Sequence, residues 1–337
     1  MILLKDIAAA CGVSVATVSK ALNGHNDIGP ETRERIRKVA DNMGYFPNSA
    51  AKALKTNRTF NIGVLFADEA RSGLTHDFFA TVLDSFRRTA EAAGFDITFI
   101  NSSHAQERSL SYLAHSRYRG FDGVCIACVD FYDPDVVDLV RSELPIVTID
   151  HSFDGKISVV SDNVSGMHDL LHYVYEMGHR RIAYIHGLPS AVTQNRLMSF
   201  YRTMAELGLS IPDEYIMEAP YRNTSETRDC TFQLLDLPTP PTCIFYPDDF
   251  SALGGYSAIQ HRKLSIPDDI SIVGFDGIRL SRHIAPRLTT YRQDMEQMGR
   301  VAAERLIELI EHPKDVIQEP ILVPGSVYQG ESVARIQ

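Results

Sequence analysis

The chain has 337 residues, 44% of them hydrophobic and 23% charged, which is ordinary for a globular protein of two or three domains. It contains no apolar run long enough to span a bilayer and no signal-peptide pattern, and its five cysteines are an odd number. We therefore expect a cytoplasmic protein. The net charge of -10 is uneven, because residues 1–58 carry +4 and the remainder carries -14. We therefore expect a polyanion to bind the basic N-terminal part only.

Two short helices are predicted at the start of the chain, over residues 5–11 and 15–23. Gly12 stands where the first helix needs a left-handed residue to end it, and Ser14 can cap the second. Val18 and Leu22 would face a small core. This arrangement is typical of a helix-turn-helix, whose second helix enters the major groove of DNA. An ordinary helical hairpin is the alternative that the pattern leaves open.

The outward face of the second predicted helix carries the DNA-binding candidates. Lys20 can reach guanine O6 and N7, and Val15 or Ala16 can touch a thymine methyl group. The hydroxyl and amide side chains beside them are candidate phosphate donors, namely Ser14, Thr17, Ser19 and Asn23.

A third helix is predicted over residues 30–43, with Pro30 in its first turn and Gly44 after its end. Pro47 then interrupts the chain, and Asn48 can cap a short helix over residues 50–54. Such a helix is too short to be stable alone. A plain linker is the alternative.

From residue 61 onward the pattern alternates between strand and helix. Residues 62–66 form an apolar run typical of a buried parallel strand, and a helical pattern over residues 78–93 and a strand over 97–100 follow. A similar unit recurs over residues 182–186 and 196–207. We therefore expect two α/β lobes of similar plan, with a ligand in the cleft at the carboxyl ends of their strands.

Polar and aromatic residues near predicted strand ends are the ligand-binding candidates. Carboxylates and an arginine bind hydroxyl groups, and an aromatic ring covers the apolar face of a sugar. The candidates are His76, Phe78, Asp150, Arg196, Tyr221, Asp248 and Asp276. Two choices stay open: His76 and Asp77 either determine which ligand binds or cap a helix, and Asp276 either binds the ligand or caps a helix. Asp249, in contrast, is expected to hold the structure of its own loop.

An enzymatic function is not expected. Cys125 and Cys128 form a CxxC pair, but residues three apart on a strand point to opposite faces and cannot share a metal. The chain contains no GxGxxG, P-loop, GxSxG or HExxH motif, and its histidines are scattered. We therefore predict no catalytic residue, metal or cofactor.

Ordered motifs through nearly the whole chain resemble one family of bacterial transcription regulators. They include KDIAAACGVSVATVSKALNG, GYFPN, AAKAL, IGVLF, MGHRRIAYIHG, DDISIVGFD and PRLTTYRQD. Together they resemble the lactose-repressor/galactose-repressor (LacI/GalR) family. The chain departs from the family pattern at Gly29, where a serine is usual, and at Pro324 and Gly325, where an arginine is usual.

The resemblance implies a small all-α helix-turn-helix head and an α/β body with two doubly wound parallel-sheet lobes of periplasmic-binding-protein type. It implies a head over residues 1–46, a hinge helix over 47–58, an N-lobe over 59–160 and 290–319, and a C-lobe over 161–289 and 320–337. The chain would cross between lobes near residues 158–162, 288–291 and 320–324. The hinge would order on operator DNA, with Leu54 wedged into the minor groove and Asn48 and Ala51 beside the DNA.

The function implied is that of a ligand-controlled DNA-binding regulator. Its most concrete form is a repressor of carbohydrate-use genes, binding a near-palindromic operator as a homodimer with a sugar-like effector in the cleft. Control by a phosphoprotein co-regulator is one alternative. A solute-binding protein is another, but the basic head and the missing signal peptide argue against it.

Overall fold

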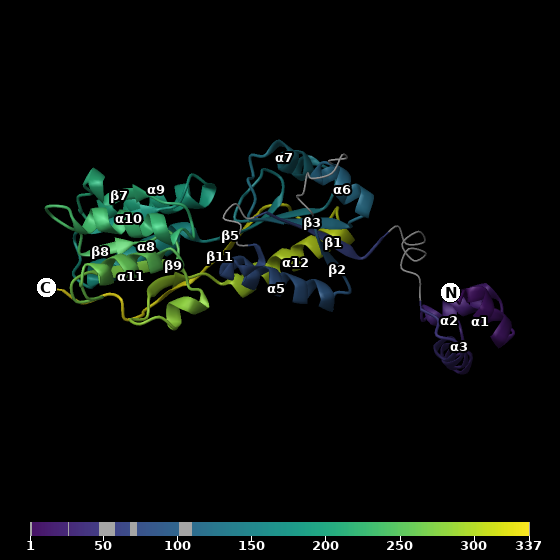
Figure 1. Cartoon of the computed structure of the whole chain (residues 1–337). Helices are drawn as coiled ribbons and strands as arrows, with labels where there is room; N and C mark the ends of the chain where they lie inside the picture. Colours follow the sequence, from purple (N-terminus) through teal and green to yellow (C-terminus); the bar gives the residue numbers. More distant parts are fainter. Residues whose placement is uncertain (1, 26, 47–57, 68–72, 101–109, 337) are drawn as a thin grey trace. The chain divides into compact units, whose positions relative to one another are not determined.

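The computed structural model describes residues 2–25, 27–46, 58–67, 73–100 and 110–336 (Figure 1). The chain divides into two compact units, Met1–Thr59 and Phe60–Gln337, and each is described by itself.

The first unit is a three-helix domain of α1 (Leu4–Cys11), α2 (Val15–Leu22) and α3 (Pro30–Asn42). Gly12 ends α1 with φ +64°, and the Ser14 hydroxyl caps α2 by accepting a hydrogen bond from Thr17 N at 3.1 Å, as predicted. Gly29 precedes α3 without a side-chain cap. The core consists of small and branched residues on the facing sides of the helices, namely Ile7, Ala8, Val18, Ala21, Ile36 and Ala40.

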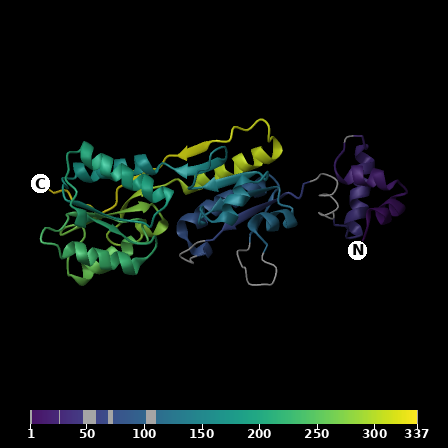
Figure 2. The same ribbon diagram turned by 90° about the horizontal axis from the view of Figure 1, so that it is seen from above.

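The second unit contains two six-stranded sheets, which define an N-lobe and a C-lobe (Figures 1 and 2). The N-lobe sheet is parallel, in the order β11-β5-β4-β3-β1-β2. Its strands are β1 (Asn61–Phe66), β2 (Asp96–Phe99), β3 (Gly123–Ala127), β4 (Ile146–Ile149), β5 (Ile157–Ser161) and β11 (Pro320–Val323).

The C-lobe sheet follows the same plan, in the order β12-β10-β9-β8-β6-β7. Its parallel strands are β6 (Ile182–His186), β7 (Ile216–Glu218), β8 (Cys243–Phe245), β9 (Ser271–Asp276) and β10 (Thr289–Arg292). The edge strand β12 (Ser326–Tyr328) runs antiparallel to β10. The expectation of two doubly wound α/β lobes is therefore confirmed, with this one antiparallel strand added.

Helices cover both faces of each sheet, which explains why the strands are apolar on both sides. In the N-lobe, α5 (Asp77–Ala92) and α12 (Met295–Glu311) cover one face, and α6 (Tyr112–Arg119) and α7 (Pro134–Arg141) cover the other. The C-lobe sheet has α8 (Asn163–Glu176) and α9 (Ala191–Glu206) on one face, with α10 (Thr224–Leu235) and α11 (Ala252–His261) on the other. Three short 3-10 helices complete the lobes: η1 (Gly73–Thr75), η2 (Asp213–Tyr215) and η3 (Arg279–Arg282).

Strand pairing places the second lobe crossing slightly later than the expected residues 288–291 and the third inside the expected residues 320–324, so that β11 belongs to the N-lobe rather than to the C-lobe. The first crossing follows β5, as expected. However, β10 lies in the C-lobe sheet as far as Arg292, and β11 pairs with β5 in the N-lobe sheet as far as Val323. The sequence pattern could not locate these ends, because each apolar segment is compatible with either sheet.

Candidate functional site

A cavity of about 440 Å³ lies at the carboxyl ends of the strands and is lined by residues from both lobes. We call it the effector cleft. All seven predicted ligand-binding residues line it: His76, Phe78, Asp150, Arg196, Tyr221, Asp248 and Asp276. The structure also adds residues that the sequence did not single out, among them Phe79, Phe131, His151, Arg222 and Gln293.

Backbone strain is concentrated around the effector cleft. Six described non-glycine residues have positive φ, and four of them line the cleft: Cys128, Asp150, Arg222 and Asp276. A side chain in this region costs energy, and such residues persist where the surrounding structure holds them in place. This clustering independently marks the cleft as a functional site.

Arg196 is held in place on several sides. The helix α9 begins at Ala191, so Arg196 lies within it rather than opening it as predicted. Its side chain is only 4% exposed, and it donates to Asn163 Oδ1 at 2.7 Å and to the Pro247 carbonyl at 2.9 Å. The guanidinium lies 3.6 Å from the ring centroid of Phe275 and 3.8 Å from Asp276 Oδ1. Arg196 therefore both lines the cleft and ties α9 to neighbouring loops.

Two carboxyl groups in the cleft have raised pKa values. Burial raises the pKa of Asp276 to about 8, although the Arg196 charge opposes the shift and Gln293 donates to Asp276 Oδ1 at 2.6 Å. Burial also raises the pKa of Asp150 to about 6, opposed by the weak hydrogen bond from Ser161 N. The pKa rises because a charged carboxylate loses its water in the cavity. Hydroxyl groups of a ligand would replace that water.

The neighbouring residues Asp248 and Asp249 have different roles. Asp248 lines the cleft and accepts hydrogen bonds from Ser251 N, Ser251 Oγ and Arg222 N at 2.7, 2.7 and 2.8 Å. Asp249 is fully buried and accepts from Ile278 N at 2.9 Å and Thr290 Oγ1 at 2.6 Å. Asp249 therefore holds local loop structure, as expected, while Asp248 is the one that faces the cleft.

Aromatic rings form much of the N-lobe wall of the cleft. Phe79 packs edge-on against Phe78 and His76, with centroid distances of 5.0 and 4.9 Å. Phe131 stacks on His151 at 4.4 Å with an interplanar angle of 7°. The sequence does not mark Phe79 as a cleft residue, because Phe79 belongs to an ordinary helical pattern. It does not mark the pair Phe131–His151 either, because these two residues come from separate loops.

Tyr221 lines the effector cleft on its C-lobe side, beside the start of α9. Its hydroxyl pairs with Thr193 Oγ1 at 2.8 Å, and its ring lies so close to Gly187 that a Cβ there would be 2.1 Å from it. Glycine at position 187 is therefore required for the ring to occupy this place.

One ion pair connects the two lobes at the edge of the cleft. Arg222 of the C-lobe lies 3.2 Å from Asp77 Oδ2 at the start of α5, and its guanidinium lies over the Phe250 ring at 4.3 Å. The N-cap residue of α5 is His76, which makes no side-chain capping bond. Of the two roles left open, His76 therefore lines the cleft, and Asp77 contacts the opposite lobe.

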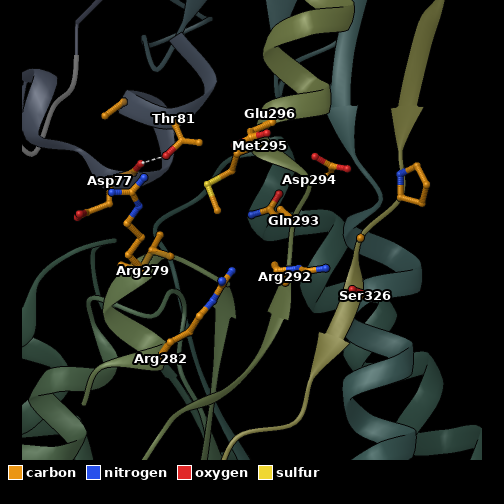
Figure 3. Close-up of a pocket in the computed structure, with 15 residues that line it drawn as sticks. Asp77, Thr81, Arg279, Arg282, Arg292, Gln293, Asp294, Met295, Glu296 and Ser326 are labelled. Carbon is orange, nitrogen blue, oxygen red and sulfur yellow. Dashed lines mark hydrogen bonds between the residues drawn. The ribbon is translucent and has the colours of Figure 1, made fainter. Parts of the chain in front are cut away.

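A second cavity, of about 670 Å³, is lined by Asp77 of this ion pair (Figure 3). We call it the arginine cavity, because Arg279, Arg282 and Arg292 line it. Gln293 lines both cavities, while Asp77 lines the arginine cavity and its partner Arg222 lines the effector cleft. The pairs Asp77–Arg222 and Gln293–Asp276 therefore lie between the two cavities.

The helix-turn-helix presents its predicted DNA-binding side chains in two ways. Val15, Ala16 and Lys20 are exposed, and Lys20 forms an ion pair with Asp27. The polar side chains bond to one another or to the backbone: Ser14 Oγ contacts Thr17 Oγ1 at 2.9 Å, and Asn23 donates to the Ser19 carbonyl at 2.7 Å. Asn48, Ala51 and Leu54 lie outside the described residues.

Three further findings concern other classes of site. Cys125 is buried on β3 and Cys128 follows that strand. Within the described ranges, no group of three or more His, Cys, Asp or Glu side chains could hold a metal ion. Among those same residues, no helix is both long and apolar enough to span a bilayer.

Comparison with known proteins identifies the family. Residues 3–48 match "Bacterial regulatory proteins, lacI family", and residues 171–333 match "Periplasmic binding protein-like domain". The HTH-type transcriptional repressor PurR of Vibrio vulnificus (strain CMCP6) is 30% identical over 329 residues, covering 94% of this chain and 96% of that protein.

Solved structures share the fold. The lac repressor dimer bound to operator and the anti-inducer ONPF has a TM-score of 0.85 at 23% identity, covering 99% of each chain. A LacI family transcriptional regulator from Enterococcus faecium with bound ribose has a TM-score of 0.70 at 24% identity, covering 82% of this chain and 100% of that chain. The chain is therefore a DNA-binding transcriptional regulator, not an enzyme, and it belongs to the LacI family of bacterial regulatory proteins.

Proposed function

We propose that this protein is a cytoplasmic repressor of carbohydrate-use genes, controlled by a sugar-like effector in the effector cleft. The observation that carries the proposal is the meeting of Arg196, Asp248 and Asp276 in one cavity with an aromatic wall. Carboxylates and a fixed arginine suit the hydroxyl groups of a sugar, and rings suit its apolar face. The ribose bound to the Enterococcus faecium regulator is consistent with this class.

The DNA-binding form would be a homodimer on a near-palindromic operator. Each head would place α2 in the major groove, since Val15, Ala16 and Lys20 are exposed there. The hinge containing Leu54 would order on the operator and insert that side chain into the minor groove, bending the DNA. Effector binding would move the lobes and separate the paired hinges, which is how the cleft would control the DNA.

The effector is tested by a thermal-shift screen of the full chain against sugars, sugar acids and nucleobases. A cleft ligand stabilises the folded protein by mass action, so a sugar should raise the melting temperature. The variant Asp248→Asn should lose the shift, whereas Asp229→Asn, at an exposed position on α10, should keep it. A chain that responds to no small molecule, but binds DNA only with a phosphoprotein, would overturn the sugar model.

The DNA-binding role is tested with an operator selected from random sequence. Lys20→Ala should cost about 1–3 kcal/mol on that operator and much less on random DNA, because a guanine contact is lost. Thr17→Ala should weaken binding to both DNAs more equally, because phosphate contacts carry no sequence information. Equal losses on both DNAs for Lys20→Ala would contradict its assignment as a base contact.

The hinge is tested separately through Leu54→Ala. This variant should bend a circularly permuted operator fragment less and bind it more weakly, while the effector-induced thermal shift without DNA stays the same. Unchanged bending and affinity would show that the segment is only a linker.

A further inference from the structure

We propose that the arginine cavity binds a small phosphate monoester that also carries hydroxyl groups, such as a sugar phosphate. This site is separate from the effector cleft and goes beyond the proposed function. Figure 3 shows Arg282 extending toward Gln293 and Met295, with Arg279 on one side and Arg292 on the other. The cavity volume of about 670 Å³ is within the range of small-molecule sites.

The three arginines have no ion-pair partner within the described part of the chain. Arg279, Arg282 and Arg292 are exposed and form no hydrogen bond or ion pair there, and Arg282 only approaches the Tyr328 ring at 5.8 Å. Other arginines of the lobes, such as Arg262, Arg287 and Arg305, are paired with carboxylates. Three arginines without an ion-pair partner in one cavity are unexpected in residues 59–337, which carry a net charge of -14.

The acidic residues around the cavity do not cancel these charges. Asp77 is paired with Arg222, and Asp294 caps α12 by accepting from Gln297 N at 2.9 Å. Asp294 and Glu296 are left to oppose the three arginines, which gives the lining an excess of one positive charge. A phosphate monoester carries roughly two negative charges at neutral pH and can accept hydrogen bonds from guanidinium groups that have no other partner.

Two long helices begin at the cavity, and the N-terminal end of α5 adds to its positive potential, whereas the Asp294 carboxylate opposes that of α12. Residues at the starts of α5, with 16 residues, and α12, with 17 residues, form part of the lining. The N-terminal end of a helix carries a partial positive charge that favours anions. Because α5 has no side-chain cap at His76, its first backbone donors are not satisfied by a capping side chain.

Gln293 supplies the reason to expect hydroxyl groups on the ligand. This side chain is 4% exposed, and its Nε2 donates to Asp276. Its Oε1 has no hydrogen-bond partner within the structure as described. A buried amide oxygen without a partner is costly, so it should accept a hydrogen bond when the cavity is filled. A hydroxyl group can donate that bond, whereas a fully ionised phosphate cannot.

The test is isothermal titration of the full chain at low ionic strength with a hexose 6-phosphate, the free hexose and methyl phosphate. The double variant Arg279→Ala/Arg282→Ala removes two cations from the cavity. The matched control is Arg117→Ala/Arg119→Ala, which removes from α6 two exposed arginines that form no ion pair among the described residues. We expect the hexose phosphate to bind the wild type and the control equally, and at least tenfold more weakly to the cavity variant.

A third variant, Asp248→Asn, separates this site from the effector cleft. Binding of the hexose phosphate should survive Asp248→Asn even though the effector response does not. Loss of phosphate binding in Asp248→Asn but not in the arginine variant would place the ligand in the effector cleft and overturn the proposal. Absence of binding to the wild type would do the same. Methyl phosphate, which has no hydroxyl group when ionised, would overturn the role given to Gln293 if it bound as tightly as the hexose phosphate.

Discussion

The two lobes share one strand plan but contribute different chemistry to the effector cleft. The N-lobe supplies mainly rings, including Phe78, Phe79 and Phe131, and the C-lobe supplies Arg196, Asp248 and Asp276. Asp150 adds a carboxyl group on the N-lobe side. The two sheets have the same strand order, whereas the segments that follow their strands carry different side chains. The sheets therefore determine where the side chains of the cleft lie, and the segments after the strands determine what those side chains can bind.

The two walls should also respond differently to substitution. The ring wall is held by packing, which tolerates another apolar side chain of similar size. The charged wall is held by hydrogen bonds with defined partners, and removing one partner leaves the others buried and unsatisfied. Substitutions at four positions test this contrast.

The largest effect is expected for Arg196→Ala. Its removal leaves Asn163 Oδ1 and the Pro247 carbonyl without their donor and Asp276 without its ion-pair partner, which should cost about 3–5 kcal/mol of unfolding free energy. Urea denaturation measures this cost. Arg202→Ala, on the exposed side of the same helix, is the control and should cost less than about 1 kcal/mol. Equal costs would show that Arg196 has no structural role.

The second effect is a pH dependence that Asp276→Asn should remove. The pKa of Asp276 rises on folding from its ordinary 3.8 to about 8, so the folded state holds the proton more tightly and stability falls as the pH rises through this window. The slope cannot exceed about 1.4 kcal/mol per pH unit for one proton.

Melting temperatures of the wild type and of Asp276→Asn between pH 6 and pH 8 measure this contribution. Other groups titrate in both proteins, so their effect is absent from the difference in melting temperature between the two. The asparagine variant should gain stability relative to the wild type toward pH 8. A difference that does not change with pH would mean that Asp276 is ionised throughout this range.

A smaller effect is expected on the ring wall from Phe78→Met. Methionine is apolar and flexible enough to fill most of the space, so the cost should be below about 1.5 kcal/mol by urea denaturation. Phe78→Asn should cost more, because it buries an amide among Phe79 and its neighbours. If both variants cost the same, packing is not what holds this wall.

The smallest effect is expected for Asp77→Asn, which removes the ion pair between the lobes. Asp77 is 47% exposed and Arg222 only 10%, so the pair should contribute about 0.2–1 kcal/mol. Salt screens such a pair, and the difference from the wild type should shrink between 0.05 and about 1 M salt. A difference that persists at high salt would contradict an electrostatic origin.

Much of the charged wall could be predicted from the sequence, because polar residues after apolar strands stand out locally. Asp150, Asp248 and Asp276 were found in this way, and the structure places them in the cavity. Arg222 and Gln293 were not, because their importance depends on partners far away in the chain, Asp77 and Asp276. The arginine cavity was missed for the same reason, since its residues come from η3, β10 and the starts of two N-lobe helices.

The late position of α12 in the chain has a consequence for biosynthesis. This helix packs along α5 and supplies Met298, Ala302, Leu306 and Ile310 to the core of the N-lobe. A ribosome therefore releases the whole of β1 to β4 and most of the C-lobe before the N-lobe can close. Until then the apolar face of α5 lacks its partner and is open to chaperones and proteases. A message truncated before Met295 would yield a C-lobe missing its edge strand β12 and an N-lobe with no completed core.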